Sequence, residues 1–186
     1  MRLGAAILLG GRSSRMGEDK AGLDWNGLSA IDRAFGLAAQ AGARAAFAVG
    51  REVPGRPSIV DDRAGPVGGV ILAARRLREA GCESALILAV DAPTLTLDDL
   101  APLLASPQGG AFDGQPLPMV MPLAALPSDA EPGWPMARLA ERAGLARPTC
   151  PPASLARVRG ANTPDERAAL LAELVRREGA RAGGAV

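Results

Sequence analysis

The stretch from Leu8 to Lys20 has the composition of a phosphate-binding loop. Its adjacent glycines, Gly10 and Gly11, allow a sharp turn in which backbone N–H groups approach an anion. Arginine can grip two phosphate oxygens at once, and lysine supplies a point charge. The side chains here that can donate to phosphate are Arg12, Ser13, Ser14, Arg15 and Lys20. Their number favours a phosphate site over an ordinary basic turn between a strand and a helix.

This loop differs from two common phosphate-binding motifs. It lacks the Gly-Lys-Ser/Thr ending of nucleoside triphosphatases, and Gly10 and Gly11 are adjacent rather than alternate as in the dinucleotide fingerprint. Lys20 taken alone would be an ordinary solvated lysine. Its position at the end of an arginine-bearing glycine loop favours a role on phosphate.

Asp91 is the second candidate, because it directly follows the apolar segment 85–90. A carboxylate at the end of a buried strand needs a partner. Mg²⁺ takes one or two carboxylates and fills its other positions with water and phosphate oxygens. Asp91 can equally cap the turn into Ala92-Pro93. From this residue alone the two interpretations are equally supported.

Other polar residues are weaker candidates. The adjacent acids Asp61 and Asp62 are typical of a polar loop, which we favour, but a strand-end position keeps Asp61 as a candidate contact to the base or ribose of a nucleotide. Asn162 can be a simple turn residue. The chain contains no His and no Tyr, so imidazole chemistry is excluded. Phosphoryl and nucleotidyl transfer need positioning and charge neutralisation more than acid–base groups, and they match this residue set.

Bulk composition narrows the class further. A chain of 186 residues with a formal net charge of +1 predicts one domain and no charged surface for nucleic acid or membrane. The apolar N-terminal run is cut too early by Gly10-Gly11 for a signal peptide, so we expect a cytoplasmic protein. Cys82 and Cys150 indicate reduced thiols rather than a disulfide framework or a zinc site.

The elements that position these residues alternate along the chain. Apolar strands are expected at 3–9, 45–49, 58–60 and 85–90, with helical patterns between and after them. Residues 64–69 are expected to form a glycine-rich turn before a helix over 70–79. Ser29, Thr96 and Thr163 have the spacing of helix N-caps. The pattern predicts an α/β fold, a Rossmann-like, doubly wound and mostly parallel sheet flanked by helices. Ligands bind at the carboxyl ends of such strands, which would bring the glycine loop, Asp61 and Asp91 to one edge.

Within the single domain 1–186 we expect a nucleotide-binding half at 1–104 and an acceptor-binding half at 105–175. The acceptor half is rich in Pro and Gly, with a strand near 116–122 and a short helix over 136–143. A helix begins at Thr163-Pro164, and residues 176–186 are expected to be a flexible tail.

Four segments together resemble the molybdenum cofactor guanylyltransferases and related nucleotidyltransferases. Residues 10–20 are similar to that family's Gly-Gly-x-x-x-Arg-Met-Gly-x-Asp-Lys signature. Residues 65–69 resemble its Gly-Pro-Leu-x-Gly, 91–93 its Asp-x-Pro, and 162–166 its Asn-Thr-Pro-Glu-Asp/Glu, in the family's order. The resemblance covers nearly the whole chain.

The resemblance implies Mg²⁺-dependent transfer of GMP from GTP to the phosphate of molybdopterin, giving molybdopterin guanine dinucleotide and pyrophosphate. It implies Lys20, Arg15 and Asp91 as catalytic residues, with Asp91 also binding the metal. The residues that it implies for nucleotide or substrate binding are Leu8, Leu9, Gly10, Gly11, Arg12, Ser13, Lys20, Asp61, Gly68, Gly69 and Asn162. Proteins that deliver molybdopterin and molybdoenzymes that receive the product would be its partners.

The choice of base depends on two short segments, and the departures from the family pattern fall mainly in the acceptor half. The related cytidylyltransferases tend to carry Ala-Gly at the position of Gly10-Gly11 and to lack a pair such as Gly65-Pro66, so guanine is favoured. Leu9 is bulkier than the family's Ala. Gly160 replaces the first Asn of the family's Asn-x-Asn-Thr-Pro, and Gly133-Trp134-Pro135 stands where relatives place a charged pair.

Two alternatives therefore stay open. One is a nucleotidyltransferase that uses CTP or another phosphorylated acceptor, such as a sugar phosphate or a phospholactate. The other is a nucleotide-binding protein without turnover.

Overall fold

The structure is a computed structural model that describes the backbone of residues 2–10, 20–61 and 65–183, with side chains to Ala180. Its strands are β1 Leu3–Leu8, β2 Asp24–Trp25, β3 Leu28–Ser29, β4 Ala46–Gly50, β5 Ser58–Val60, β6 Ser84–Ala89, β7 Gly110–Ala111 and β8 Met119–Pro122. Its helices are α1 Ala30–Gln40, α2 Gly65–Glu79, α3 Leu97–Leu104, α4 Met136–Arg142, α5 Pro152–Arg159 and α6 Pro164–Gly183, with 3-10 turns η1 Lys20–Gly22 and η2 Leu123–Ala125.

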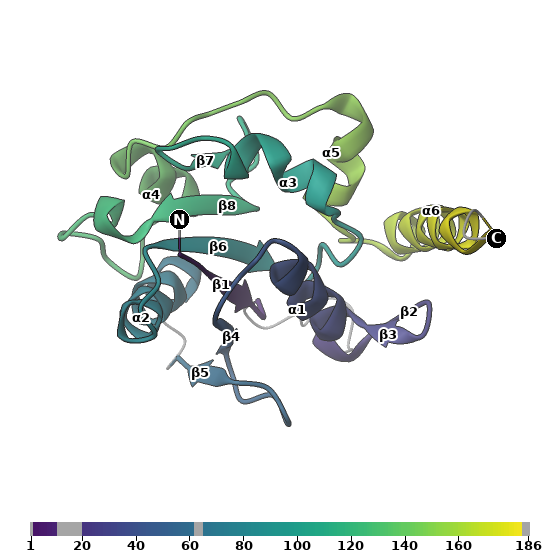
Figure 1. The fold of residues 1–186 in the computed structure, drawn as a ribbon, viewed down its shortest axis with the longest axis horizontal. Helices are drawn as coiled ribbons and strands as arrows, with labels where there is room; N and C mark the ends of the chain where they lie inside the picture. The colour runs from purple at the N-terminus through teal and green to yellow at the C-terminus, as the bar shows by residue number, and fades with distance from the viewer. Residues whose placement is uncertain (1, 11–19, 62–64, 184–186) are drawn as a thin grey trace.

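A six-stranded sheet in the order β5-β4-β1-β6-β8-β7 forms the centre of the molecule (Figure 1). Strands β5, β4, β1 and β6 are parallel to one another, whereas β8 runs antiparallel to β6 and β7 antiparallel to β8. The predicted mostly parallel, doubly wound sheet is confirmed. The expected strand near 116–122 is β8, and it joins the same sheet as the strands of the first half.

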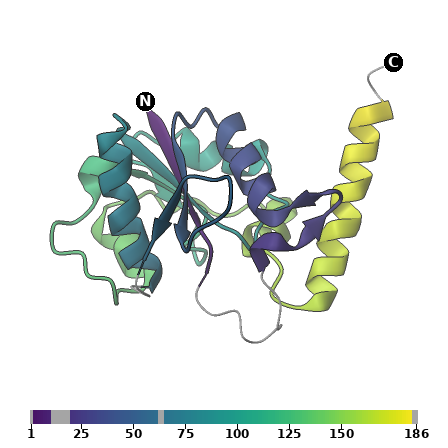
Figure 2. The same cartoon turned by 90° about the horizontal axis from the view of Figure 1, so that it is seen from below.

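Helices cover both faces of this sheet, so its central strands are buried. Every residue of β1 is buried, and in β6 only the last residue, Ala89, is partly exposed. Helices α1, α3, α5 and α6 contribute to one apolar cluster, and α2 and α4 contribute to the other. Figure 2 shows α2 and α1 on opposite sides of the sheet, with α6 beyond α1. This layering explains why the parallel strands are apolar on both faces.

The predicted helix starts are confirmed. The hydroxyl of Ser29 accepts from the Asp32 amide at 3.2 Å. At α3, Thr96 and Asp99 form a reciprocal capping box. At α6, the Glu166 carboxylate accepts from the Thr163 amide, while the Thr163 hydroxyl accepts from the Glu166 amide. Each cap satisfies backbone donors that the first helical turn leaves free.

Two helices are longer than the sequence predicts. Residues 65–69, expected as a glycine turn, form the first part of α2, with Pro66 in the first turn where its missing N–H costs nothing. Helix α6 continues to Gly183, so the flexible tail predicted from 176 is wrong over that range. The Glu178 carboxylate accepts from Arg33 at 2.8 Å, which anchors this part of α6 to α1.

Helix α5 and the short strand β7 were not predicted from the sequence. Helix α5 buries only Ser154 and Val158, so it has no apolar stripe from which a helix could be predicted. Among the described residues, no helix is both long enough and apolar enough to cross a membrane.

Candidate active site

The carboxyl ends of the parallel strands carry the candidate residues, as predicted. Gly10 follows β1, Asp61 follows β5 and Asp91 follows β6. Because β1 and β6 are neighbours in the sheet, the segments that leave them emerge side by side. Asp61 lies three strands away from β6, a separation of about 14 Å at the spacing of paired strands.

Lys20 and Asp91 lie close together in the structure, although 70 residues separate them in the sequence. Lys20 lies in a turn after β1, and Asp91 lies in the loop after β6. The Lys20 Nζ atom lies 3.9 Å from Asp91 Oδ2, and 19% of the Lys20 side chain and 33% of the Asp91 side chain are exposed. Both side chains are therefore partly buried and still accessible to solvent. The predicted convergence is confirmed for these two residues.

Burial raises the pKa of Asp91, and the nearby Lys20 ammonium opposes that rise. Burial removes water from a carboxylate and disfavours its charged form, and a nearby positive charge favours that form again. The environment of Asp91 therefore favours a cation at its carboxylate.

A turn from the distant α5–α6 connection completes the described part of the site. The Ala161 amide donates to the Asp91 carbonyl at 2.9 Å. The Ala161 carbonyl accepts from Lys20 Nζ at 3.3 Å. One residue thus contacts both members of the pair through its main chain. Sequence reasoning missed Ala161, because a main-chain contact carries no side-chain signature.

Gly160 allows this turn to approach. Its φ is +68°, and a Cβ at this position would lie 2.3 Å from the Asp91 carbonyl oxygen. Gly160 appeared in the sequence only as a departure from a family motif. In the structure a side chain there would collide with the backbone of the Asp91 loop. The glycine itself is therefore the sequence signal for this close contact.

Asn162 behaves as a turn residue in this structure. Its side-chain amide donates to the Arg159 carbonyl at 3.3 Å, and its backbone amide donates to Glu166 Oε2 at 2.8 Å. Both contacts are local, so they account for Asn162 without a ligand.

Leu8, Leu9 and Gly10 lead from β1 toward the candidate site. The Leu8 side chain is buried in the core, and its carbonyl accepts from Val90 at 3.0 Å. The Leu9 amide donates to Val49 at 3.0 Å. Gly10 has a φ of +78°, which favours glycine where the chain leaves the strand. The remaining loop candidates, Gly11, Arg12, Ser13 and Arg15, lie outside the described residues.

Gly68 and Gly69 are buried in α2, not in a loop. A Cβ on Gly69 would lie 2.9 Å from Val49 Cγ1 and 3.3 Å from Asp61 Oδ2. The absence of a side chain on Gly69 is therefore explained by helix-to-sheet packing, and it places Asp61 beside α2.

Among the described residues, Asp91 is the carboxylate that best fits Mg²⁺. No cluster of three or more Cys, Asp or Glu side chains occurs among the described residues, so those residues form no all-protein cage. Asp91 alone fits the pattern in which Mg²⁺ takes one carboxylate and completes its shell with water and phosphate oxygens. Its burial and raised pKa agree with such a site.

The chain is similar to known proteins in sequence and in fold. Residues 5–142 match the family described as the MobA-like NTP transferase domain. This chain belongs to that family. The MobA-like match includes β1, Lys20, Asp61 and Asp91, and it ends before the Gly160–Ala161 turn.

One curated relative of this MobA-like chain is the molybdenum cofactor guanylyltransferase of Xanthomonas euvesicatoria pv. vesicatoria, 39% identical over 121 residues. The alignment covers 63% of this chain and 62% of that relative, so it spans less than two thirds of either protein.

Solved structures share the fold over almost the whole MobA-like chain. A nucleotidyl transferase from Methanothermobacter thermautotrophicus matches with a TM-score of 0.66 and 17% identity, covering 95% of this chain and 99% of that one. Molybdopterin-guanine dinucleotide biosynthesis protein A from Archaeoglobus fulgidus matches with a TM-score of 0.63 and 18% identity, covering 92% and 98%.

Proposed function

We propose that this protein is a nucleotidyltransferase that transfers GMP from GTP to the phosphate of molybdopterin, releasing pyrophosphate. The observation that carries the proposal is the Lys20–Asp91 pair at the carboxyl ends of β1 and β6 in a MobA-like chain. The choice of GTP and molybdopterin is supported by the relative named molybdenum cofactor guanylyltransferase.

In this proposal Lys20 binds the phosphates of the nucleotide. Its ammonium is held by the Ala161 carbonyl at 3.3 Å and lies near a carboxylate, so its position is set before a ligand arrives. A preorganised positive charge stabilises the negative charge that develops when the pyrophosphate leaves. Arg12, Ser13 and Arg15 on the same loop would add donors to the triphosphate.

Asp91 would hold Mg²⁺. The ion would neutralise phosphate charge and align the nucleotide. The protein's own part is to keep the Asp91 carboxylate in place through its carbonyl bond to Ala161. Asp61, which lies beside α2, would contact the nucleoside, and Gly10 and Gly11 would line the path of the nucleotide together with Leu9. Leu8, Gly68 and Gly69 are buried, so they would shape this edge of the sheet from behind, and Asn162 would act through its turn.

The experiment incubates the purified protein with Mg²⁺ and molybdopterin and with either GTP or CTP, and measures pyrophosphate and the dinucleotide product. We expect product with GTP. The variant Lys20→Met should lower kcat by about 10²–10³-fold, the usual effect of removing one preorganised group that stabilises transition-state charge. Arg76→Met is the control, because Arg76 forms an exposed ion pair with Glu79 on α2.

The outcomes separate the alternatives. If product forms with CTP but not with GTP, the protein is a cytidylyltransferase. If no product forms with either nucleotide, molybdopterin is not the acceptor. Binding of GTP without turnover in any acceptor assay would indicate a nucleotide-binding protein.

A further inference from the structure

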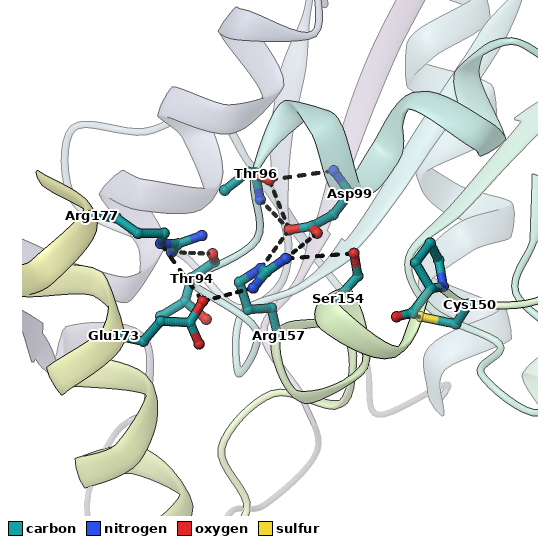
Figure 3. Close-up of polar contacts among 9 residues, drawn as sticks. Thr94, Thr96, Asp99, Cys150, Ser154, Arg157, Glu173 and Arg177 are labelled. Atoms are coloured by element: carbon teal, nitrogen blue, oxygen red, sulfur yellow. Dashed lines mark hydrogen bonds and ion pairs between the residues drawn. The ribbon is translucent and has the colours of Figure 1, made fainter. Parts of the chain in front are cut away.

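A partly buried ion-pair cluster joins three helices (Figure 3). Arg157 on α5 donates to both carboxylate oxygens of Asp99 on α3, at 2.8 and 2.6 Å. It also donates to Glu173 on α6 at 2.7 Å. The Asp99 side chain is only 2% exposed and that of Arg157 14%. We call these three residues the Arg157 cluster.

The Arg157 cluster spans the two connections that meet at the site. Helix α3 begins directly after the loop that carries Asp91, and Asp99 also caps that helix through Thr96. The Gly160–Ala161 turn connects α5 to α6, between Arg157 and Glu173. A single guanidinium therefore ties the helices on both sides of the contact between Ala161 and Asp91.

Helix α5 has few other anchors. Its N-cap, Pro151, makes no side-chain cap bond, and its buried residues are Val158 and Ser154, whose side chain also hydrogen-bonds Asp99. Gly160 ends the helix, with its amide donating to Ala156 at 3.2 Å. Because little apolar packing holds α5, the bidentate bond of Arg157 sets where the last turn of the helix and the following peptide lie.

That placement has to be accurate. The Ala161 amide and carbonyl reach Asp91 and Lys20 at 2.9 and 3.3 Å, and the Gly160 backbone is so close to the Asp91 carbonyl that only hydrogen fits at its Cα. A displacement of about 1 Å breaks such bonds and can cost a reaction 10²-fold.

We propose that Arg157 is a positioning residue, which acts through the Gly160–Ala161 peptide to hold Lys20 and Asp91 in the arrangement used for nucleotidyl transfer. This inference rests on the proposed function for its kinetic consequence. The link between Arg157 and the Ala161 peptide is a property of the folded chain and can be measured without turnover.

The test compares Arg157→Lys with the wild-type protein. Lysine keeps the charge but cannot form the two parallel bonds to Asp99. Glu173→Gln is a milder second variant, because it leaves the bidentate pair intact. Arg142→Lys is the matched control, since Arg142 bonds Asp129 at 2.8 Å on the surface, with both side chains at least half exposed.

The first readout is amide hydrogen exchange at Ala161, with Leu86 to Leu88 of β6 as internal reference. We expect Arg157→Lys to speed exchange of Ala161 at least tenfold relative to β6, with a smaller effect of Glu173→Gln and none of Arg142→Lys. An unchanged Ala161 rate in Arg157→Lys would overturn the proposal. Equal acceleration of Ala161 and β6 would also overturn it, because that indicates global destabilisation.

The second readout is steady-state kinetics with Mg²⁺, GTP and molybdopterin, at a temperature where every variant is folded. We expect kcat of Arg157→Lys to fall about 10- to 100-fold with KM for GTP unchanged. If Arg157→Lys speeds Ala161 exchange but keeps the wild-type kcat, the positioning role of Arg157 is refuted and the proposed function is not. A wild-type protein without turnover of any nucleotide would refute the proposed function, and with it the catalytic part of this inference.

Discussion

At the scale of single residues, Asp91 combines a buried position with a charge that its surroundings only partly balance. Burial raises its pKa above the ordinary 3.8. The folded state therefore binds a proton at Asp91 more readily than the unfolded chain does. Its contribution to stability falls as the pH rises from 3.8 through the folded-state pKa, so at neutral pH the ionised carboxylate is unfavourable in the free protein.

We therefore expect Asp91→Asn to be at least as stable as the wild type at pH 7 while its turnover falls by about 10²-fold or more. Thermal unfolding and the nucleotidyl-transfer assay measure the two effects. Asp113→Asn is the control, because Asp113 is 79% exposed and should change neither quantity. A lower melting temperature for Asp91→Asn would mean that Asp91 is a structural cap and not a metal ligand.

Gly160 is a second residue for which the structure predicts the effect of a substitution. Gly160→Ala places a Cβ 2.3 Å from the Asp91 carbonyl oxygen and also forces a non-glycine residue to a φ of +68°. With a ψ of −172°, this backbone conformation is almost restricted to glycine and costs another residue about 1–3 kcal/mol. Because the collision adds to this, we expect a larger loss of unfolding free energy, together with a loss of turnover.

Gly144→Ala is a control for the positive φ of that variant. Gly144 has a φ of +64°, and nothing lies within 4 Å of a Cβ built there. It should show the cost of a positive φ without a collision in denaturant unfolding and keep wild-type turnover. Equal losses of stability for the two variants would contradict the close approach of Gly160 to Asp91.

At the scale of elements, helices α3, α5 and α6 are joined by the Arg157 cluster. Burial opposes ionisation of Asp99, but it is outweighed by hydrogen bonds from Arg157, Ser154 and Thr96, which lower the pKa of Asp99 to about 2. Since the folded-state pKa lies below the ordinary 3.8, the stabilisation is fully present above pH 3.8 and is lost as the pH falls toward 2.

Asp99→Asn should therefore reduce stability at pH 7 and flatten the pH dependence of unfolding between pH 4 and 2. Breaking a buried pair costs about 3–5 kcal/mol where the remaining charge has no other partner, and we expect a smaller loss here because Arg157 keeps its bond to Glu173. Chemical denaturation at several pH values measures both effects. Asp129→Asn, which breaks the exposed pair with Arg142, should cost about 0–1 kcal/mol. Equal costs for the two variants would show that burial of the Arg157 cluster has no energetic effect.

At the scale of the whole molecule, the proposed site brings together the first and last parts of the chain. Lys20 follows β1, whereas Ala161 precedes α6, and 141 positions separate them. A ligand that binds Lys20 and Asp91 would therefore stabilise the folded protein as a whole, because it binds only when these segments are assembled.

We expect GTP with Mg²⁺ at a hundredfold excess over its Kd to add about 2.7 kcal/mol to the free energy of unfolding. Thermal unfolding with GTP, with CTP and after chelation of Mg²⁺ measures this effect. The shift should be greatest with GTP and Mg²⁺ and should shrink on chelation. An equal shift with chelator present would show that Mg²⁺ takes no part in nucleotide binding.

The parts of the fold that were predictable depend on residues near one another in the sequence. Ser29 with Asp32, Thr96 with Asp99, and Thr163 with Glu166 are pairs three positions apart, so their residue types indicate helix starts directly. The buried strands β1 and β6 are predictable because strands covered on both faces are apolar throughout. Helix α5 was not predictable, because an ion pair rather than an apolar stripe anchors it.

The fold class, the helix starts and the meeting of Lys20 and Asp91 at the carboxyl edge of a parallel sheet follow from residue types and their order in the chain. The packing of the folded chain adds that Ala161 bonds both residues and that Gly160 must lack a side chain. It also brings Arg157 to Asp99 across 58 positions. These two kinds of feature differ in origin, because local caps and strand patterns follow from residue type, whereas main-chain contacts between distant segments depend on where packed helices bring the backbone.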